Sequence, residues 1–359
     1  MEKTKNILIV EDSDVVALLL QAVLEKESDF NVVGRAINGR EALRMTKALK
    51  PDLITMDIQM PVMDGFEATR AIMIEQPTPI VVVSSHINDE EMHISFRAIE
   101  EGALAVVEKP PGVTHPDFAR VCKELIYSIR TMAGLRVKRR TAATPPPGAT
   151  RPSAMATGGT HVPQIIAIGC STGGPQALHT IIRHLTSGMG IPIVVVQHIS
   201  KGFLRGMTRW VQESSALDIR IAEHNETLQP DTVYFAPDSK HLVVNQSNGK
   251  LKARLEVSPP VNQFRPSATP LFSSVARACP GKAIGVLLTG MGGDGAEGLL
   301  AMHRAGCHTI VQDQASSVVW GMPRAAIELD AVNKVLPLDD MADHLLSVVG
   351  VKKLKQGTA

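Results

Sequence analysis

Five polar side chains in the first third of the chain stand at the ends of short β-branched runs. In chain order they are Glu11, Asp12, Asp57, Ser84 and Lys109. Clustered carboxylates form a hard, oxygen-rich site that suits Mg²⁺. A carboxylate beside such a metal can attack a phosphoryl group, while a hydroxyl and an ammonium group receive the charge of the new acyl phosphate. Because acids end strands in many proteins, it is the order of all five that predicts a phosphoryl-transfer site.

A second set of polar residues follows strand-like runs in the second half of the chain. Ser171 lies in Gly-Cys-Ser-Thr-Gly, residues 169–173, which fits the G-x-S-x-G elbow that exposes a serine hydroxyl. Such a turn also directs backbone N–H groups at one point, where an oxyanion could form. His198 could then serve as general base, and Asp294 could orient the imidazole. The set predicts nucleophilic catalysis by a serine.

Two other interpretations of these turns stay open at this point. A Ser-Thr-Gly-Gly turn at the start of a helix can simply cap that helix. Residues 290–295, Gly-Met-Gly-Gly-Asp-Gly, also fit the G-x-G-x-x-G pattern of a dinucleotide site, with Asp313 at the spacing of a ribose-binding acid. A dinucleotide site would leave the turns at Ser171 and His198 unexplained, which favours the hydrolase.

The elements that must position the first set alternate between strands and helices. Strand-like runs are expected at residues 6–12, 30–36, 52–58, 79–85 and 104–110. Amphipathic stretches such as 14–27 and 39–50 separate them. This alternation predicts a flavodoxin-like (βα)5 domain, a doubly wound parallel sheet covered on both faces. In such a sheet, functional residues gather at the carboxyl ends of the strands.

The second half of the chain is also predicted to be α/β, with a mostly parallel sheet. Its strand-like runs are residues 164–171, 191–200, 232–237, 241–246, 283–290 and 308–313. Residues 241–256 alternate around an Asn-Gly pair, which predicts a β-hairpin.

Length and composition indicate a protein of two domains. The chain has 359 residues, more than twice the ~150 typical of one domain, and 44% are hydrophobic. We expect a first domain over 1–130, a basic, proline-rich linker over 131–162, a catalytic domain over 163–350 and a tail over 351–359. A net charge of +1 and 12 aromatic residues (8 Phe, 2 Tyr, 2 Trp) argue against nucleic-acid binding. Four scattered cysteines, no signal peptide and no run of ~18–20 apolar residues predict a cytoplasmic protein.

The stretch from about Lys5 to Arg130 resembles the receiver domain of two-component response regulators. The matching motifs are ILIVEDS, LITMDIQMPVMDG, VVVSS and VEKP. The resemblance implies that a histidine kinase phosphorylates Asp57, that Ser84 and Lys109 contact the phosphate, and that Mg²⁺ is held by Glu11, Asp12, Asp57 and the Gln59 carbonyl. Receivers often carry an aromatic switch residue where this chain has Val106, so we expect no relay through an aromatic rotamer. A degenerate receiver used only for docking is the alternative.

The stretch from about Gln164 to Leu346 resembles the catalytic domain of the CheB chemotaxis methylesterases. The matching segments are IGCSTGGP, VVVQHI, VYFAPDSKHLVV, RPSATPLFSSVA and GVLLTGMGGDGAEG. The resemblance implies that Ser171 is the nucleophile, His198 the base and Asp294 its orienting acid, with oxyanion donors from the backbone of Thr172 and Met291. Cys170 and Thr269 depart from the residues common in the family, Ala and Asp, and we expect neither to touch the three catalytic residues.

The two resemblances together imply a phosphorylation-activated serine hydrolase. It would demethylate glutamate methyl esters on methyl-accepting chemoreceptors, releasing methanol, and deamidate particular receptor glutamines, with no cofactor for the esterase step. It would work beside membrane receptor arrays without membrane insertion, and phosphorylation would shift the receiver away from the active-site cleft. The alternatives are a phospho-switched protein that only docks on receptors, which would need no catalytic triad, and a DNA-binding regulator, for which the chain has no helix-turn-helix pattern.

Overall fold

The computed structural model describes residues 4–85, 89–135, 137 and 162–351 of the chain. Most of the linker predicted over 131–162 and of the tail predicted over 351–359 lies outside these residues. The chain divides into two compact units, residues 1–151 and 152–359. Among the described residues, no helix combines the length and apolar character needed to cross a membrane.

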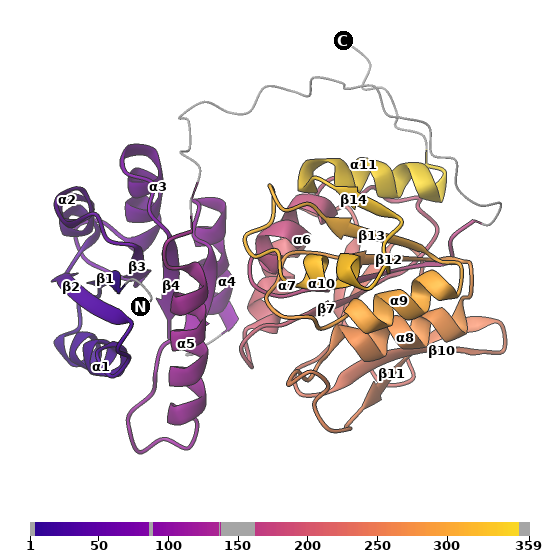
Figure 1. The fold of residues 1–359 in the computed structure, drawn as a ribbon, viewed down its shortest axis with the longest axis horizontal. Helices are drawn as coiled ribbons and strands as arrows, with labels where there is room; N and C mark the ends of the chain where they lie inside the picture. The colour runs from indigo at the N-terminus through magenta and orange to yellow at the C-terminus, as the bar shows by residue number, and fades with distance from the viewer. Residues whose placement is uncertain (1–3, 86–88, 136, 138–161, 352–359) are drawn as a thin grey trace, which may run out of the picture. The chain divides into compact units, whose positions relative to one another are not determined.

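A five-stranded parallel sheet with strand order β2-β1-β3-β4-β5 forms the centre of the first unit (Figure 1). The strands are β1 Lys5–Val10, β2 Phe30–Ala36, β3 Leu53–Met56, β4 Ile80–Ser84 and β5 Ala105–Glu108. The helices are α1 Asp14–Leu24, α2 Gly39–Leu49, α3 Gly65–Glu75, α4 Asp89–Glu100 and α5 Phe118–Met132. Every residue of β3 and β4 is buried, as expected for central strands covered by helices on both faces.

Side chains at the strand-to-helix turns determine where the helices of this unit begin. Ser13, Asn38 and Asp64 each accept a hydrogen bond from a backbone N–H in the first turn of α1, α2 and α3. Strands β1 and β3 run parallel, with Val10 opposite Met56. The residues that follow the two strands therefore meet at one edge of the sheet, as predicted.

A seven-stranded parallel sheet with strand order β14-β13-β12-β6-β7-β9-β8 forms the centre of the second unit. Its strands are β6 Ile165–Cys170, β7 Ile193–Gln197, β8 Asp218–Ile221, β9 Thr232–Phe235, β12 Ala283–Leu287, β13 His308–Gln312 and β14 Lys334–Leu336. The helices are α6 Gly174–Ile182, α7 Leu204–Glu213, α8 Ala268–Ala278, α9 Ala296–Arg304, α10 Met322–Glu328 and α11 Leu338–Val349. The sequence did not predict β8 and β14, because these short edge strands are partly exposed and lack a buried apolar run.

The helices of this unit form two layers, α6, α7 and α11 on one side and α8, α9 and α10 on the other (Figure 1). The predicted hairpin is confirmed as β10 His241–Ser247 and β11 Lys250–Glu256, and its first strand, β10, packs against α8. Its two-residue turn, Asn248-Gly249, has positive φ at both positions (51° and 73°), as a tight I′ turn requires.

Candidate catalytic and phosphorylation sites

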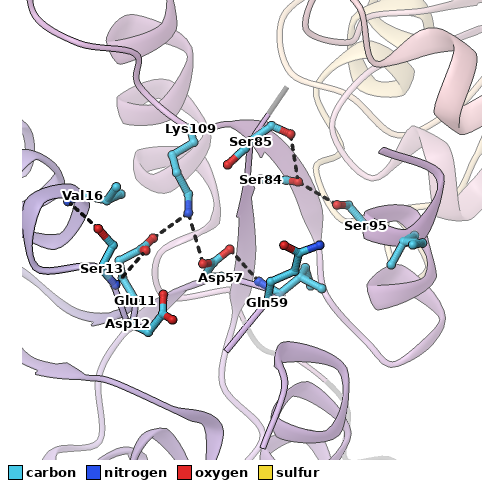
Figure 2. A pocket seen from close by; sticks show the side chains of 12 residues that line it. Glu11, Asp12, Ser13, Val16, Asp57, Gln59, Ser84, Ser85, Ser95 and Lys109 are labelled. Atoms are coloured by element: carbon cyan, nitrogen blue, oxygen red, sulfur yellow. Dashed lines mark hydrogen bonds and ion pairs between the residues drawn. The ribbon is translucent and has the colours of Figure 1, made fainter. Parts of the chain in front are cut away.

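Three carboxylates meet at the carboxyl edge of the first sheet. Glu11 and Asp12 follow β1, Asp57 follows β3, and one oxygen of each lies within 4.8 Å of the others. They line a pocket of about 290 Å³, which Figure 2 shows from close by. The pocket has room for several water-sized ligands. This geometry brings the predicted acids together.

Lys109, at the end of β5, reaches two of these carboxylates. Its Nζ lies 2.8 Å from Glu11 Oε2 and 3.2 Å from Asp57 Oδ2 (Figure 2). Burial raises the pKa of Glu11, and the nearby charge of Asp57 adds to this, while the hydrogen bond from Lys109 opposes it. Burial lowers the pKa of Lys109, but Asp57 and Glu11 outweigh it, so the ammonium form is stabilised. Three carboxylates face one ammonium, a donor set and charge that fit a divalent cation.

Ser84, the last residue of β4, lies at the same edge but has a different partner. Its hydroxyl is 2.7 Å from that of Ser95 on α4 (Figure 2). Gln59 lines the pocket beside Asp57. Val106, which occupies the position where receivers often carry an aromatic switch residue, is a small apolar side chain of β5 and is only 8% exposed.

In the second unit, Ser171 stands in a tight turn between β6 and α6. Gly173 has φ of +77°, and a Cβ there would lie 2.6 Å from Val318. A Cβ on Gly174 would lie 2.0 Å from Gln197 Oε1. Both positions therefore require glycine for close approach. Helix α6 has no side-chain hydrogen bond at its cap, so the interpretation of the Ser-Thr-Gly-Gly turn as a helix cap is wrong.

His198 and Asp294 form a buried pair. His198 Nε2 lies 2.9 Å from Asp294 Oδ2, with side chains 6% and 0% exposed. The carboxylate accepts from four further donors: Asn262 Nδ2 (3.2 Å), Ser267 Oγ (2.6 Å), Ala268 N (2.7 Å) and Thr269 Oγ1 (3.0 Å). Burial alone would raise the pKa of Asp294. The hydrogen bond and charge of His198, together with hydrogen bonds from Ser267 and Ala268, outweigh burial and hold this pKa well below its usual range.

The ionised carboxylate determines which imidazole nitrogen carries the proton. Because Asp294 can only accept, the proton of neutral His198 is on Nε2. Nδ1 then keeps its lone pair, and it is buried without a hydrogen-bond partner in the part of the chain that the structure describes. This is the free basic nitrogen of the site. Relative to the familiar pattern, in which Nδ1–H faces the acid, the two nitrogens have exchanged places.

Ser171 and His198 are neighbours across the sheet. Cys170 pairs with Gln197 in the register of β6 and β7, so the next residue of each strand lies side by side. The Gln197 amide bridges them, donating to the carbonyl of Ser171 at 2.9 Å and of His198 at 2.7 Å. The described residues show no hydrogen bond between the Ser171 hydroxyl and His198, and such contacts often tighten only when substrate binds.

The two predicted oxyanion donors are the N–H groups of Thr172 and Met291. In each case the carbonyl group of the same peptide unit accepts hydrogen bonds. The Ser171 carbonyl also accepts from the N–H of Gly174 at 2.8 Å. The Gly290 carbonyl accepts from the N–H of Gly321 (2.9 Å) and of Met322 (2.8 Å). In a trans peptide the N–H points opposite to the carbonyl, so each of these contacts fixes the direction of the next N–H, that of Thr172 and of Met291.

Two interpretations of this region need correction. We expected Thr269 not to touch the catalytic residues, but it donates to Asp294, because the first turn of α8 is directed at that carboxylate. The dinucleotide interpretation is wrong as well. Asp294 is buried and saturated by donors, and Asp313 accepts from the backbone and hydroxyl of Ser316 (3.0 and 2.5 Å), closing its own turn.

Four residues of the site escaped the sequence analysis: Gln197, Asn262, Phe264 and Ser267. Gln197 had a signal, since it is a polar residue closing an otherwise apolar strand next to His198. Phe264 stacks on the His198 ring with centroids 3.9 Å apart and an interplanar angle of 5°. The last three come from a segment far from His198 in the chain, so no spacing or period could have indicated them.

Comparison with known proteins agrees with both sites. A model of the CheB methylesterase family matches residues 166–345, and a model of the response regulator receiver domain matches residues 7–115. A protein-glutamate methylesterase/protein-glutamine glutaminase of Methanospirillum hungatei JF-1 is 43% identical over 353 residues, 96% of this chain and 98% of that protein. One of Myxococcus xanthus DK1622 is 42% identical over 344 residues, 95% of this chain and 96% of that protein.

Among solved structures, the catalytic domain of the Thermotoga maritima CheB methylesterase matches with a TM-score of 0.51 and 36% identity. The match covers 52% of this chain and 98% of that chain. The fold and the two sites define a hydrolase that carries a response-regulator receiver. With the relatives above, the chain belongs to the CheB family of protein-glutamate methylesterases/glutaminases. It acts in chemotaxis adaptation under the control of its receiver domain.

Proposed function

We propose that Ser171 is the nucleophile, that His198 is the general base through Nδ1, and that Asp294 orients the imidazole. The observation that carries this assignment is the buried Nδ1 of His198 beside the serine turn, which has no partner among the described residues, with Nε2 held by Asp294. A buried polar atom without a partner is uncommon and indicates a group awaiting substrate or reaction. Assignment of the base to Nδ1 follows from the acceptor-only carboxylate on Nε2.

The reaction then runs through an acyl-enzyme. His198 Nδ1 takes the Ser171 proton as Oγ bonds to the ester carbonyl carbon, and the resulting oxyanion is stabilised by the N–H groups of Thr172 and Met291. The carbonyl re-forms as the C–O bond to the methoxy group breaks, and Nδ1–H protonates that group to give methanol. Water attacks the acyl-enzyme with Nδ1 again as base, and glutamate and Ser171 are released. With a glutamine side chain, ammonia leaves instead.

We propose glutamate methyl esters and particular glutamines of methyl-accepting chemoreceptors as the substrates, reached from the cytoplasm. The activity for which the relatives are named, protein-glutamate methylesterase/protein-glutamine glutaminase, supports this. The protein would attach to receptor arrays without entering the bilayer. Its proposed domains are a receiver over 1–130, a linker over 131–162, a catalytic domain over 163–350 and a tail over 351–359.

In the receiver, we propose that Asp57 accepts a phosphoryl group from a histidine kinase. Glu11, Asp12, Asp57 and the Gln59 carbonyl would hold Mg²⁺, which supplies charge neutralisation for phosphoryl transfer when bound. Lys109 already contacts Asp57 and is placed to pair with the new phosphate, and Ser84 would donate its hydroxyl to it. Phosphorylation would favour an arrangement in which the receiver leaves the active-site cleft open.

The test is methanol release from membranes carrying chemoreceptors with tritium-labelled methyl esters, with and without acetyl phosphate and Mg²⁺. We expect release that requires Ser171 and that rises with acetyl phosphate only when Asp57 is present, so Ser171→Ala and Asp57→Ala separate the two halves. Unchanged release by Ser171→Ala would overturn the nucleophile assignment. Removal of residues 1–162 should raise release above that of the unphosphorylated chain, and equal or lower release would overturn inhibition by the receiver.

A further inference from the structure

Between β11 and α8 the chain passes the catalytic pair in a short segment, residues 259–267, which we call the strap. A single buried imidazole closes it at both ends. His241 Nε2 donates to the Pro259 carbonyl (3.1 Å), and His241 Nδ1 accepts from the Ser267 N–H (3.2 Å). Within it, Arg265 donates to the Ser258 carbonyl at 3.0 Å. The ends of the strap are therefore held in one position by groups outside the catalytic residues.

The middle of the strap is a tight two-residue turn. Val261 and Phe264 exchange backbone hydrogen bonds of 3.0 and 2.9 Å, and Asn262 and Gln263 between them both have positive φ (52° and 71°). This is the I′ arrangement, which glycine or asparagine adopts easily and glutamine does not. Such a conformation persists where the surroundings determine it, and it is frequent at functional sites.

Two side chains of the turn, from its first central residue and from the residue that closes it, contact the catalytic pair. The ring of Phe264 lies on the imidazole face of His198, 3.9 Å between centroids and 5° from parallel. The amide of Asn262 donates to Asp294 Oδ1 at 3.2 Å. One short turn thus contacts both the base and the acid that orients it, from a segment that contributes none of the three catalytic residues.

We propose that the strap is a positioning device for the catalytic base, in which Phe264 fixes the plane of the His198 ring and stabilises its protonated form while Asn262 steadies Asp294. The inference deepens the proposed function and rests on its assignment of His198 as base. Phe264 and Asn262 are positioning residues, because they act on His198 and Asp294 and not on the substrate.

The His198 ring needs a second contact because Nδ1, the nitrogen proposed as the base, has no hydrogen bond among the described residues to fix its direction. The bond to Asp294 holds one edge of the imidazole, but it leaves the ring free to rotate about the axis through Nε2. A ring stacked at 3.9 Å blocks that rotation and so fixes the direction in which Nδ1 points. The aromatic face also attracts a cation most strongly where water is excluded, so it favours the imidazolium that forms in each half of the reaction. A leucine would fill the space without supplying that face.

A second stacked pair in the same unit offers a comparison. His179 on α6 lies on Trp210 of α7 with centroids 4.4 Å apart and a 16° interplanar angle, and its Nε2 contacts the Ser214 hydroxyl at 2.8 Å. Both ends of that pair belong to helix packing. Changing Trp210 therefore disturbs a histidine stack of the same kind without touching the catalytic pair.

The test compares Phe264→Leu with Phe264→Tyr in the full chain, using methanol release from tritium-labelled receptor membranes. We expect Phe264→Leu to lower kcat about tenfold with KM within about twofold, and Phe264→Tyr to restore kcat. In NMR spectra the imidazole protons of His198 should move downfield in Phe264→Leu, because the ring current of Phe264 is lost, and return in Phe264→Tyr. Asn262→Ala should have a smaller effect on kcat, since Asp294 keeps its other donors.

Three controls separate this proposal from its alternatives. Gln263→Gly places glycine at an exposed turn position with φ of 71° and should keep wild-type kcat. Trp210→Phe should also keep it once folding is verified by circular dichroism. If Ser171→Ala abolishes release while Phe264→Leu keeps both wild-type kcat and wild-type His198 resonances, the strap proposal is wrong and the proposed function stands. If Ser171→Ala retains full release, the proposed function itself has failed.

Discussion

Two aspartates, Asp57 in the first unit and Asp294 in the second, have contrasting surroundings. Each comes after a strand of a parallel sheet in the chain, and each contacts one basic side chain. Asp57 keeps a side chain 13% exposed and accepts one backbone N–H, from Ile58 at 2.8 Å, besides its contact with Lys109. Asp294 is fully buried and accepts from five donors. This difference agrees with the proposed roles, because a carboxylate that reacts needs unfilled acceptor positions, whereas one that orients another group can have them filled.

The pKa shifts of the buried carboxyl groups also differ between the two sites, since that of Glu11 is raised and that of Asp294 is lowered. In the first, burial raises the pKa of Glu11 and the nearby charge of Asp57 adds to this, although the hydrogen bond from Lys109 opposes the shift. The second surrounds its single carboxylate with donors, so its charge is stabilised in the resting state. A change of charge in the receiver pocket would therefore alter the balance of its interactions, whereas the carboxylate of the esterase site already has its charge balanced by donors.

The largest expected effect comes from Asp294→Asn. Asp294 Oδ2 accepts from both His198 Nε2–H and the Ala268 N–H. An amide N–H group at this position would face donors, so the imidazole would no longer be held in the tautomer with a free Nδ1. We expect kcat for methyl-ester hydrolysis to fall on the order of 10³–10⁴-fold.

Asp57→Asn is the matched change at the other site. It should remove the stimulation by acetyl phosphate, with the phosphorylated form absent by mass spectrometry. Equal losses of unstimulated activity in the two variants would show that the two carboxylates do not divide the work in this way.

A smaller effect is expected from Gln197→Ala. The change removes the amide that holds the Ser171 and His198 carbonyls, so the Thr172 N–H is less well directed at the oxyanion. We expect kcat to fall about 10- to 100-fold with little change in KM. Cys170→Ala is the control, because it removes only the thiol that donates to Gln197 Oε1 at 3.0 Å. A Gln197→Ala enzyme with normal kcat would show that the turn holds its shape without this amide.

The pH dependence of stability should have opposite slopes in the two units. Burial raises the pKa of Glu11, so the fold favours its protonated form and its contribution to the free energy of unfolding falls as pH rises through the carboxyl range. For Asp294, burial raises the pKa but the hydrogen bonds of His198 and Ser267 outweigh it. Its stabilisation is therefore complete above the usual range and is lost as pH falls below it.

At neutral pH, Glu11→Gln should then stabilise the receiver and Asp294→Asn should destabilise the second unit. Both tryptophans, Trp210 and Trp320, belong to the second unit, so denaturant unfolding followed by their fluorescence reports on that unit alone. Hydrogen exchange of β1 and β3 reports on the receiver. Destabilisation of the receiver by Glu11→Gln would contradict the raised pKa assigned to Glu11.

The smallest expected effect concerns the contact between Ser84 and Ser95. Ser95→Ala frees the Ser84 hydroxyl from its partner on α4 and makes it available to a phosphoryl group on Asp57. One hydrogen bond of this kind corresponds to a rise of about two- to tenfold in the rate of phosphorylation by acetyl phosphate. Ser95→Thr keeps a hydroxyl and should behave as the wild type. A slower rate in Ser95→Ala would show that the contact assists phosphorylation.

Much of this protein follows from its sequence. Fully buried strands such as β3, β4, β6 and β7 appear as continuous apolar runs, because a parallel sheet covered on both faces has no polar side. The residues that end these runs then share one edge of each sheet. The strands that escaped prediction, β8 and β14, lie at the edges, where exposure weakens the pattern.

The sequence by itself determined the two sheets, the strand-end positions of the acids, serine and histidine, and the glycines that the serine turn requires. These depend on period, steric limits and chain direction, which are local properties. Only the tertiary structure decided which nitrogen of His198 faces Asp294, that Thr269 and Asn262 donate to that carboxylate, and that Phe264 stacks on the His198 ring. Those contacts join segments far apart in the chain, and their geometry exists only once both sides of the fold are in place.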